Sequence, residues 1–331
     1  MEGLLRTLGS VVGRGQSAAA RPPRHRPFSK VDASLLRGVP KDATRAFGKA
    51  VPASANPGVR LEPSFVDAAE AERAVAEANE LLAALGISHV TEELTARHAL
   101  QMAHLARPPP PNMLRLTGRD EGAAWIAAAQ RRAPWGYGGA LDATALPPTL
   151  AAIADRIASC EAFALGPLRD VTINQRRHGF FRLDPHLDPS ADGANVFILG
   201  FESPTVLTVS PANPRGAALM DQRKAALRSW APGEDVDVLS EPRTLIHLHG
   251  PARARLGHGT RLGVSRSQLE QCGVELSSEG EGGEDEEDDD DDDDRNGGVL
   301  FDWWGSVHHP IRRNPTRTSL VFAFADVDEE F

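Results

Sequence analysis

Apolar residues recur at helical spacing in the first half of the chain. This spacing predicts helices at residues 64–85, 91–106 and 148–160. In the first, Asp67 and Glu70 stand at capping-box spacing, and in the last, Leu150, Ile153 and Ile157 share one face. The predicted helical support region spans residues 60–165. It includes residues 107–139, where four consecutive prolines and several aromatic residues predict either a lid over a site or ordinary packing of helices on a sheet.

Beyond residue 165 the apolar runs become short and rich in β-branched residues, which predicts strands. These runs lie at residues 168–174, 195–201, 205–211, 245–249 and 318–325. The second and third are split by Glu-Ser-Pro, a spacing that predicts a hairpin. We therefore expect an α+β, mainly β fold, in which the helices buttress one face of an antiparallel sheet in a core at residues 166–326. That is the usual build of a double-stranded β-helix, or jelly-roll.

The charge of the chain has to be considered by segment. The formal net charge is -10 from 36 basic and 46 acidic residues, but 13 of the acidic residues lie at positions 279–294 without a basic one. Such a run repels itself and buries nothing, so a disordered acidic insertion is predicted at about residues 265–298, with a basic partner as the functional alternative. Outside the run 36 basic residues face 33 acidic ones, a balance that neither favours nor excludes nucleic acid.

The first 30 residues contain six Arg or Lys and one acidic residue, with apolar positions on one helical face. This composition is typical of a mitochondrial or chloroplast transit peptide. The alternative is a plain disordered tail on a cytoplasmic or nuclear protein. No apolar run approaches the length of a membrane span, so no membrane association is expected.

The chemistry is suggested by His186-Leu187-Asp188, a His-x-Asp step at the edge of a predicted strand. Two ligands from such a step and a distant histidine make the facial triad of non-heme Fe(II), which leaves coordination positions open. Two choices exist for the third ligand, His258 or one of the pair His308 and His309, and the residues alone leave this choice open. Arg317 and Ser319 lie on one face of a later strand, where a guanidinium fork can hold a carboxylate at two points. An ion pair with an Asp at the sheet edge is the structural alternative for Arg317.

In this order the fragments resemble the AlkB-like branch of the Fe(II)/2-oxoglutarate dioxygenases. The matching features run from Asn174 through His186-x-Asp188, Pro242-Arg-Thr-Leu245 and Gly250-x-x-Arg253 to His258-Gly259 and Arg317-x-Ser319. The chain departs from the family pattern at Arg176, where the family has Tyr, and at Ala323, where many members have a second Arg.

The resemblance implies that His186, Asp188 and His258 bind Fe(II). It also implies that Arg317, Ser319 and Asn174 hold the co-substrate 2-oxoglutarate, and that O2 is consumed with release of succinate and CO2. The expected reaction is hydroxylation or oxidative demethylation of a nucleic-acid or protein substrate. A catalytically silent jelly-roll that binds a protein partner is the alternative, and a cupin-like metalloenzyme of other chemistry is a further rival.

Overall fold

The computed structural model describes residues 28, 33–84, 113–115, 146–160, 162–176, 183–188, 192–211, 226–276 and 299–326. Several predicted features lie outside these residues: the transit peptide up to residue 27, the helix at 91–106, nearly all of the lid at 107–139 and the acidic run at 279–294. Within the described part, no helix is long and apolar enough to cross a lipid bilayer.

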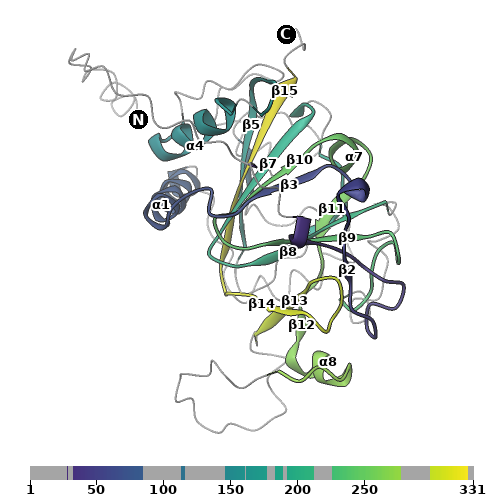
Figure 1. The fold of residues 1–331 in the computed structure, drawn as a ribbon. Coiled ribbons are helices and arrows are strands. Elements are labelled where there is room, and N and C mark those ends of the chain that lie inside the picture. Colours follow the sequence, from purple (N-terminus) through teal and green to yellow (C-terminus); the bar gives the residue numbers. More distant parts are fainter. Residues whose placement is uncertain are drawn as a thin grey trace, which may run out of the picture.

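The protein is mainly β, with two antiparallel six-stranded sheets (Figure 1). The first, sheet A, has the order β2-β1-β9-β8-β11-β6, formed by β2 (Lys49–Ala50), β1 (Leu36–Gly38), β9 (Val236–Ser240), β8 (Thr205–Ser210), β11 (Gly257–Thr260) and β6 (Leu183–His186). The second, sheet B, has the order β3-β10-β7-β15-β5-β4, formed by β3 (Val59–Glu62), β10 (Leu245–Leu248), β7 (Asn195–Phe201), β15 (Arg317–Asp326), β5 (Leu165–Arg176) and β4 (Met113–Arg115). The short 3-10 helices η2 (Ala33–Leu35) and η3 (Ala53–Ala55) flank β1 and β2.

The chain passes from one sheet to the other as it proceeds. β5 belongs to sheet B and β6 to sheet A, β7 to B and β8 to A, β10 to B and β11 to A, and β15 returns to B. The four strands β9-β8-β11-β6 thus follow the same order as β10-β7-β15-β5. We infer that the sheets are stacked, with β6 over β5 and β11 over β15.

Two layers of apolar side chains follow from the period-2 alternation of the strands. On β7, Val196 and Ile198 belong to a core cluster shared with Leu207 of β8 and Val238 of β9, so they fill the space between the sheets. Phe197 belongs instead to a second cluster on the other face of sheet B. Near-continuous burial of β7 is the result, because both of its faces are covered.

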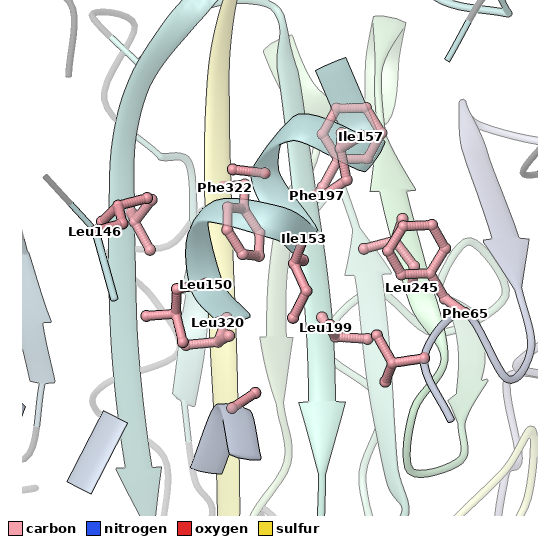
Figure 2. Close-up of a cluster of buried hydrophobic side chains, with 14 of the residues drawn as sticks. Phe65, Leu146, Leu150, Ile153, Ile157, Phe197, Leu199, Leu245, Leu320 and Phe322 are labelled. Carbon is pink, nitrogen blue, oxygen red and sulfur yellow. The ribbon is translucent and has the colours of Figure 1, made fainter. Parts of the chain in front are cut away.

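Helices α1 (Ala68–Ala84) and α4 (Pro148–Ala158) cover this second face of sheet B (Figure 1). Leu150, Ile153 and Ile157 of α4 project onto Leu320 and Phe322 of β15 (Figure 2). These two segments confirm the predicted helices at 64–85 and 148–160, with ends trimmed by a few residues.

Polar contacts orient the two helices. Asp67 caps α1 by accepting a hydrogen bond from the amide of Glu70 at 2.7 Å. Glu77 of α1 accepts from the amide of Thr149 at 2.9 Å and so caps α4, whose own N-cap residue makes no side-chain bond. Arg156 of α4 pairs with Glu70 at 2.5 Å.

The predicted hairpin at 195–201 and 205–211 is wrong. Both strands form, but β7 pairs in sheet B and β8 in sheet A. Glu202, with a φ of 68°, begins the short turn after which the chain enters the other sheet. Ser203 Oγ in this turn accepts a hydrogen bond from the amide of Asn314 at 3.0 Å, which holds the turn in place. Short β-branched runs predict strands, but they do not specify the partner of each strand.

The predicted start of the disordered insertion at residue 265 is also wrong. Residues 264–276 fold as β12 (Val264–Ser265), α8 (Arg266–Gln271) and a turn, and α8 has a complete capping box between Ser265 and Gln268. β12 pairs with β13 (Leu300–Trp303), which pairs with β14 (Pro310–Arg312) in a third, small sheet. Leu269 and Trp303 are buried in a cluster of this unit, and that burial is what orders the segment.

The strands β1, β2 and β3 were not predicted. They extend the edges of both sheets with residues that precede the first predicted helix at 64–85. The alternation of apolar and polar residues in Val59-Arg-Leu-Glu62 is a signal that could have identified β3.

Candidate metal centre

The two histidines of the candidate site lie opposite each other on neighbouring strands. His186 ends β6, and His258 of β11 is its register partner. Their ring centroids are 4.5 Å apart. His258 is also the partner of Val209, which faces the space between the sheets, so the site opens on the inner face of sheet A at its β6 edge.

Asp188 follows β6 by two residues and completes the group. Its carboxylate oxygens lie 3.6 Å from His186 Nε2 and 3.7 Å from His258 Nε2. One ligand atom from each of the three residues lies within 4.8 Å of the others. These separations are too long for good hydrogen bonds and suit three atoms that surround a common metal ion.

Electrostatics keep the group in the protonation states that bind metals. Burial lowers the pKa of His258 to about 4 against the opposing effect of Asp188, so the imidazole is neutral near pH 7. Burial alone would raise the pKa of Asp188, but His258, His186 and Arg253 together hold it well below its usual range. The site therefore offers two imidazoles and one carboxylate, which is a mixed N/O set suited to Fe(II).

Arg253 supports this group and was not predicted as a site residue. It lies in the short helix α7 (Gly250–Ala254), is 5% exposed, and donates from Nη1 to the backbone oxygen of Asp188 at 3.2 Å. A buried cation beside a carboxylate ligand both orients the loop and favours the ionised form of Asp188. The Gly250-x-x-Arg253 spacing was the available signal.

The alternative third ligands lie elsewhere. His308 Nε2 is 2.9 Å from the backbone oxygen of Thr44, and the rings of His308 and His309 pack on Phe47 at 5.4 and 4.8 Å. Neither belongs to the group formed by His186 and Asp188. Of the two choices that the sequence left open, the structure brings only His258 to the His-x-Asp pair.

The predicted co-substrate residues are brought together on sheet B. Arg317 begins β15, and Ser319 pairs with Asn174 of β5 on one side and Gly200 of β7 on the other. The intervening Thr318 faces the helices, where it donates to Glu202 at 2.7 Å. Arg317, Ser319 and Asn174 thus share the inner face of sheet B, toward the face of sheet A that carries the histidines.

Gly200 leaves space for the guanidinium of Arg317. A Cβ at Gly200 would lie only 3.0 Å from Arg317 Nη2 and 3.7 Å from its Cζ. A side chain at position 200 would therefore displace Arg317, and glycine there lets the guanidinium lie across the neighbouring strand.

His247 of β10 lies on the other face of sheet B, opposite Phe197 of the second core cluster. His247 is 1% exposed, stacks on Phe197 at 4.3 Å, and its Nε2 lies 3.0 Å from Asn195 Oδ1. Burial lowers its pKa to about 2, with His249 and Arg60 adding to the effect. This neutral core histidine agrees with its omission from the predicted site.

These features define a class: a β-rich protein with a candidate His/Asp/His metal centre between two sheets. No protein-family model matches the chain, and no curated protein matches it in sequence. Among similar solved structures is the crystal structure of the non-heme alpha-ketoglutarate-dependent epimerase SnoN from nogalamycin biosynthesis. It is 16% identical over 83% of this chain and 81% of that chain, with a TM-score of 0.33. At this identity and TM-score the likeness does not indicate a function for this chain.

Proposed function

We propose that this protein is an Fe(II)- and 2-oxoglutarate-dependent oxygenase with a double-stranded β-helix core. The observation that carries the proposal is the convergence of His186, Asp188 and His258 on one point. The passage of successive strands between two stacked sheets supports the jelly-roll assignment, because that winding is what a double-stranded β-helix has. His186 and His258 would bind from facing positions of β6 and β11, and Asp188 from the segment that follows β6.

The residues fit both groups that the proposal requires. Asp188 Oδ2 is buried and accepts no hydrogen bond from any described residue, as expected of an atom that coordinates a cation. Arg317 on the inner face of sheet B suits the distal carboxylate of 2-oxoglutarate, since a planar fork can bind both oxygens. Iron bound here would supply oxygen chemistry coupled to conversion of 2-oxoglutarate to succinate and CO2.

The roles of the chain's own residues follow from their positions. His186, Asp188 and His258 would hold the ion from one side, and Arg253 would keep the Asp188 loop in position. Arg317, Ser319 and Asn174 would orient the co-substrate. Because β6 is the edge strand of sheet A and His186 is 38% exposed, the primary substrate would approach from this edge.

The decisive experiment is anaerobic addition of Fe(II) and then 2-oxoglutarate to the full chain. A metal-to-ligand charge-transfer band in the visible spectrum is expected only if iron and the 2-oxo acid bind together. A silent jelly-roll would show no band and no iron binding, whereas a cupin-like enzyme of other chemistry would bind iron without a 2-oxoglutarate-dependent band. Either result would overturn the proposal.

Arg317→Lys tests the co-substrate half. Lysine keeps the charge but loses the two-point contact. The binding free energy of 2-oxoglutarate should therefore weaken by the value of about one charge-assisted hydrogen bond, roughly 1.5 to 3 kcal/mol, and its Michaelis constant should rise accordingly. Iron affinity should be unchanged. Normal 2-oxoglutarate binding by both Arg317→Lys and Arg317→Ala would reduce Arg317 to an ion-pair residue.

For the substrate, we propose a methylated nucleic acid or protein, as the AlkB-like order of motifs suggests. Hydroxylation of an N-methyl carbon gives an unstable carbinolamine that releases formaldehyde. Screening methylated oligonucleotides and peptides for formaldehyde release tests this class. We also propose organelle targeting by residues 1–30, which a fluorescent fusion of that segment tests by microscopy.

A further inference from the structure

Ser240 is a buried residue of the inner face that the sequence did not single out. It is the last residue of β9. Its side chain lies on the same face as those of Val236 and Val238, which pack into the core between the sheets. Asp237 projects to the opposite face, where it bonds Thr208. Ser240 is 2% exposed, and its Oγ has no hydrogen-bond partner among the residues that the structure describes.

A buried hydroxyl without a partner is costly, so its position needs a reason. The cross-strand neighbour of Ser240 is Thr205, but Thr205 Oγ1 bonds Asp302 at 3.1 Å and does not serve Ser240. The local polar groups of β8 and β9 therefore leave the Ser240 hydroxyl available.

The unpartnered hydroxyl and the guanidinium of Arg317 both lie next to Gly200. Measured from the position that a Cβ would have on Gly200, Ser240 Oγ is at 3.8 Å and Arg317 Nη2 is at 3.0 Å. The two groups come from opposite sheets and meet at the one residue of β7 that has no side chain. A guanidinium and a hydroxyl from different sheets therefore both lie close to Gly200.

We propose that Ser240 donates a hydrogen bond to the distal carboxylate of the 2-oxo acid held by Arg317. The inference rests on the proposed function and extends its co-substrate site to sheet A. A guanidinium can donate one hydrogen bond to each oxygen of a carboxylate. A hydroxyl from the facing sheet can then donate to a lone pair that remains on one of these oxygens. Closing the site from both sheets would select 2-oxo acids that carry a second carboxylate.

The test measures ligand binding without turnover. Mn(II)-loaded full-length protein is titrated anaerobically by calorimetry with 2-oxoglutarate, and separately with 2-oxobutyrate, which lacks the distal carboxylate. Ser240→Ala should weaken 2-oxoglutarate binding by about 10- to 100-fold, the range for a hydrogen bond to a charged group. Binding of 2-oxobutyrate should stay within about twofold of the wild-type value, because the metal chelate does not involve Ser240.

Two variants serve as controls. Ser240→Thr retains the hydroxyl and should recover most of the 2-oxoglutarate affinity. Ser229→Ala removes another buried serine hydroxyl, which donates to Asp235 at 2.9 Å, and should leave both affinities unchanged. An equal loss for both acids in Ser240→Ala would identify a structural role and overturn the inference, as would no loss for either acid.

The same titrations separate this inference from the proposed function. If wild-type protein binds Mn(II) but neither 2-oxo acid, the oxygenase proposal fails and the Ser240 assignment fails with it. If wild-type protein binds 2-oxoglutarate and Ser240→Ala binds it equally well, only the Ser240 assignment fails. Gly200→Ala provides an independent check, since its Cβ would intrude on Arg317 and should weaken 2-oxoglutarate more than 2-oxobutyrate.

Discussion

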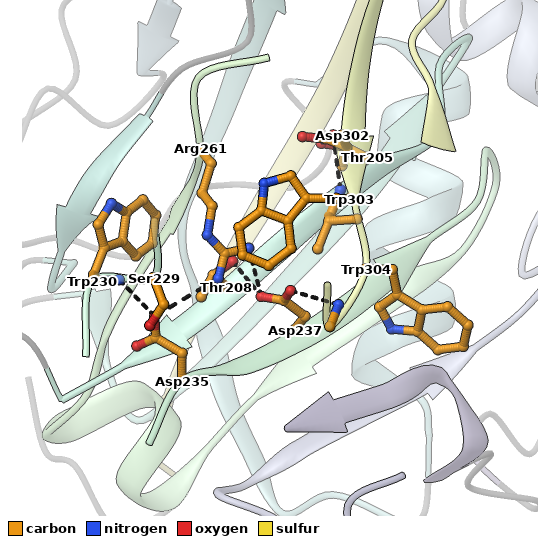
Figure 3. Close-up of polar contacts among 12 residues, drawn as sticks. Thr205, Thr208, Ser229, Trp230, Asp235, Asp237, Arg261, Asp302, Trp303 and Trp304 are labelled. Atoms are coloured by element: carbon orange, nitrogen blue, oxygen red, sulfur yellow. Dashed lines mark hydrogen bonds and ion pairs between the residues drawn. The ribbon is translucent and has the colours of Figure 1, made fainter. Parts of the chain in front are cut away.

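The two faces of sheet A carry similar residues in opposite electrostatic situations. On the outer face Asp237 accepts hydrogen bonds from Thr208 at 2.7 Å and the amide of Gly305 at 2.8 Å, and pairs with Arg261 at 2.8 Å (Figure 3). On the inner face Asp188 has histidines at 3.6 and 3.7 Å and one oxygen without a hydrogen bond from the described residues. The outer carboxylate has its partners within the protein, and the inner one belongs to the candidate metal centre.

The polar cluster around Asp237 and Arg261 on the outer face connects sheet A to the small third sheet, β12-β13-β14. The Arg261 guanidinium lies 3.8 Å from the ring centroid of Trp303, and Asp302 pairs with Arg313 at 2.5 Å while accepting from the amide of Val206 at 3.1 Å. Because these charges are buried together, removal of one partner leaves the other uncompensated. This comparison predicts that outer-face changes alter stability and inner-face changes alter metal binding.

The largest effect is expected from the metal ligands. Asp188→Ala or His258→Ala should lower Mn(II) or Fe(II) affinity by more than about 100-fold, beyond the loss expected for residues that only support ligands. The matched control is the double change His308→Ala and His309→Ala, which should leave affinity unchanged. Equilibrium metal binding measures both, and the reverse pattern would show that the third ligand is one of the control histidines.

A large effect on stability is expected on the outer face. Arg261→Met removes the partner of Asp237 and should lower the free energy of unfolding by about 3 to 5 kcal/mol, the usual cost of breaking a buried pair. Denaturant unfolding of the metal-free protein measures it. Metal affinity at low temperature should be unchanged. A loss below about 1 kcal/mol would place the pair among weak surface ion pairs and remove the contrast between the two faces.

An intermediate effect is expected from Arg253, which touches the inner site without binding the metal. Arg253→Met should weaken metal binding by about 10- to 100-fold, since residues that orient ligands typically contribute that much. Arg253→Lys, which keeps the charge near Asp188, should lose less. Unchanged affinity in the methionine variant would mean that backbone packing alone holds the Asp188 loop.

The smallest effect is expected from His247, a neutral histidine that is buried against Phe197 on the helix-covered face of sheet B. Its pKa in the folded protein is lowered to about 2 from 6.5, so below pH 6.5 the unfolded chain binds a proton that the folded protein does not. Stability should therefore fall with decreasing pH, by about 1.4 kcal/mol per unit for this group. His247→Leu should reduce that slope in unfolding measured at pH 7.5 and 5.5. An unchanged slope would assign the acid sensitivity to other groups.

Part of this protein could be predicted from local sequence because local chemistry determines it. Helices α1 and α4 follow from apolar spacing and caps, and the strands follow from short β-branched runs. His186 and Asp188 are two residues apart, so their proximity needs no tertiary information. Arg317 and Ser319 share a strand face for the same reason.

Other features depend on which strands become neighbours, and only the tertiary structure decided them. β7 and β8 enter different sheets although three residues separate them, because the turn at Glu202 directs the chain across the core. The choice of His258 over His308 depends on β11 pairing with β6 while the N-terminal segment covers His308. Ser240 and Arg317 both lie next to Gly200 because the sheets stack and Gly200 has no side chain, and such an approach of distant segments leaves no local pattern in the sequence.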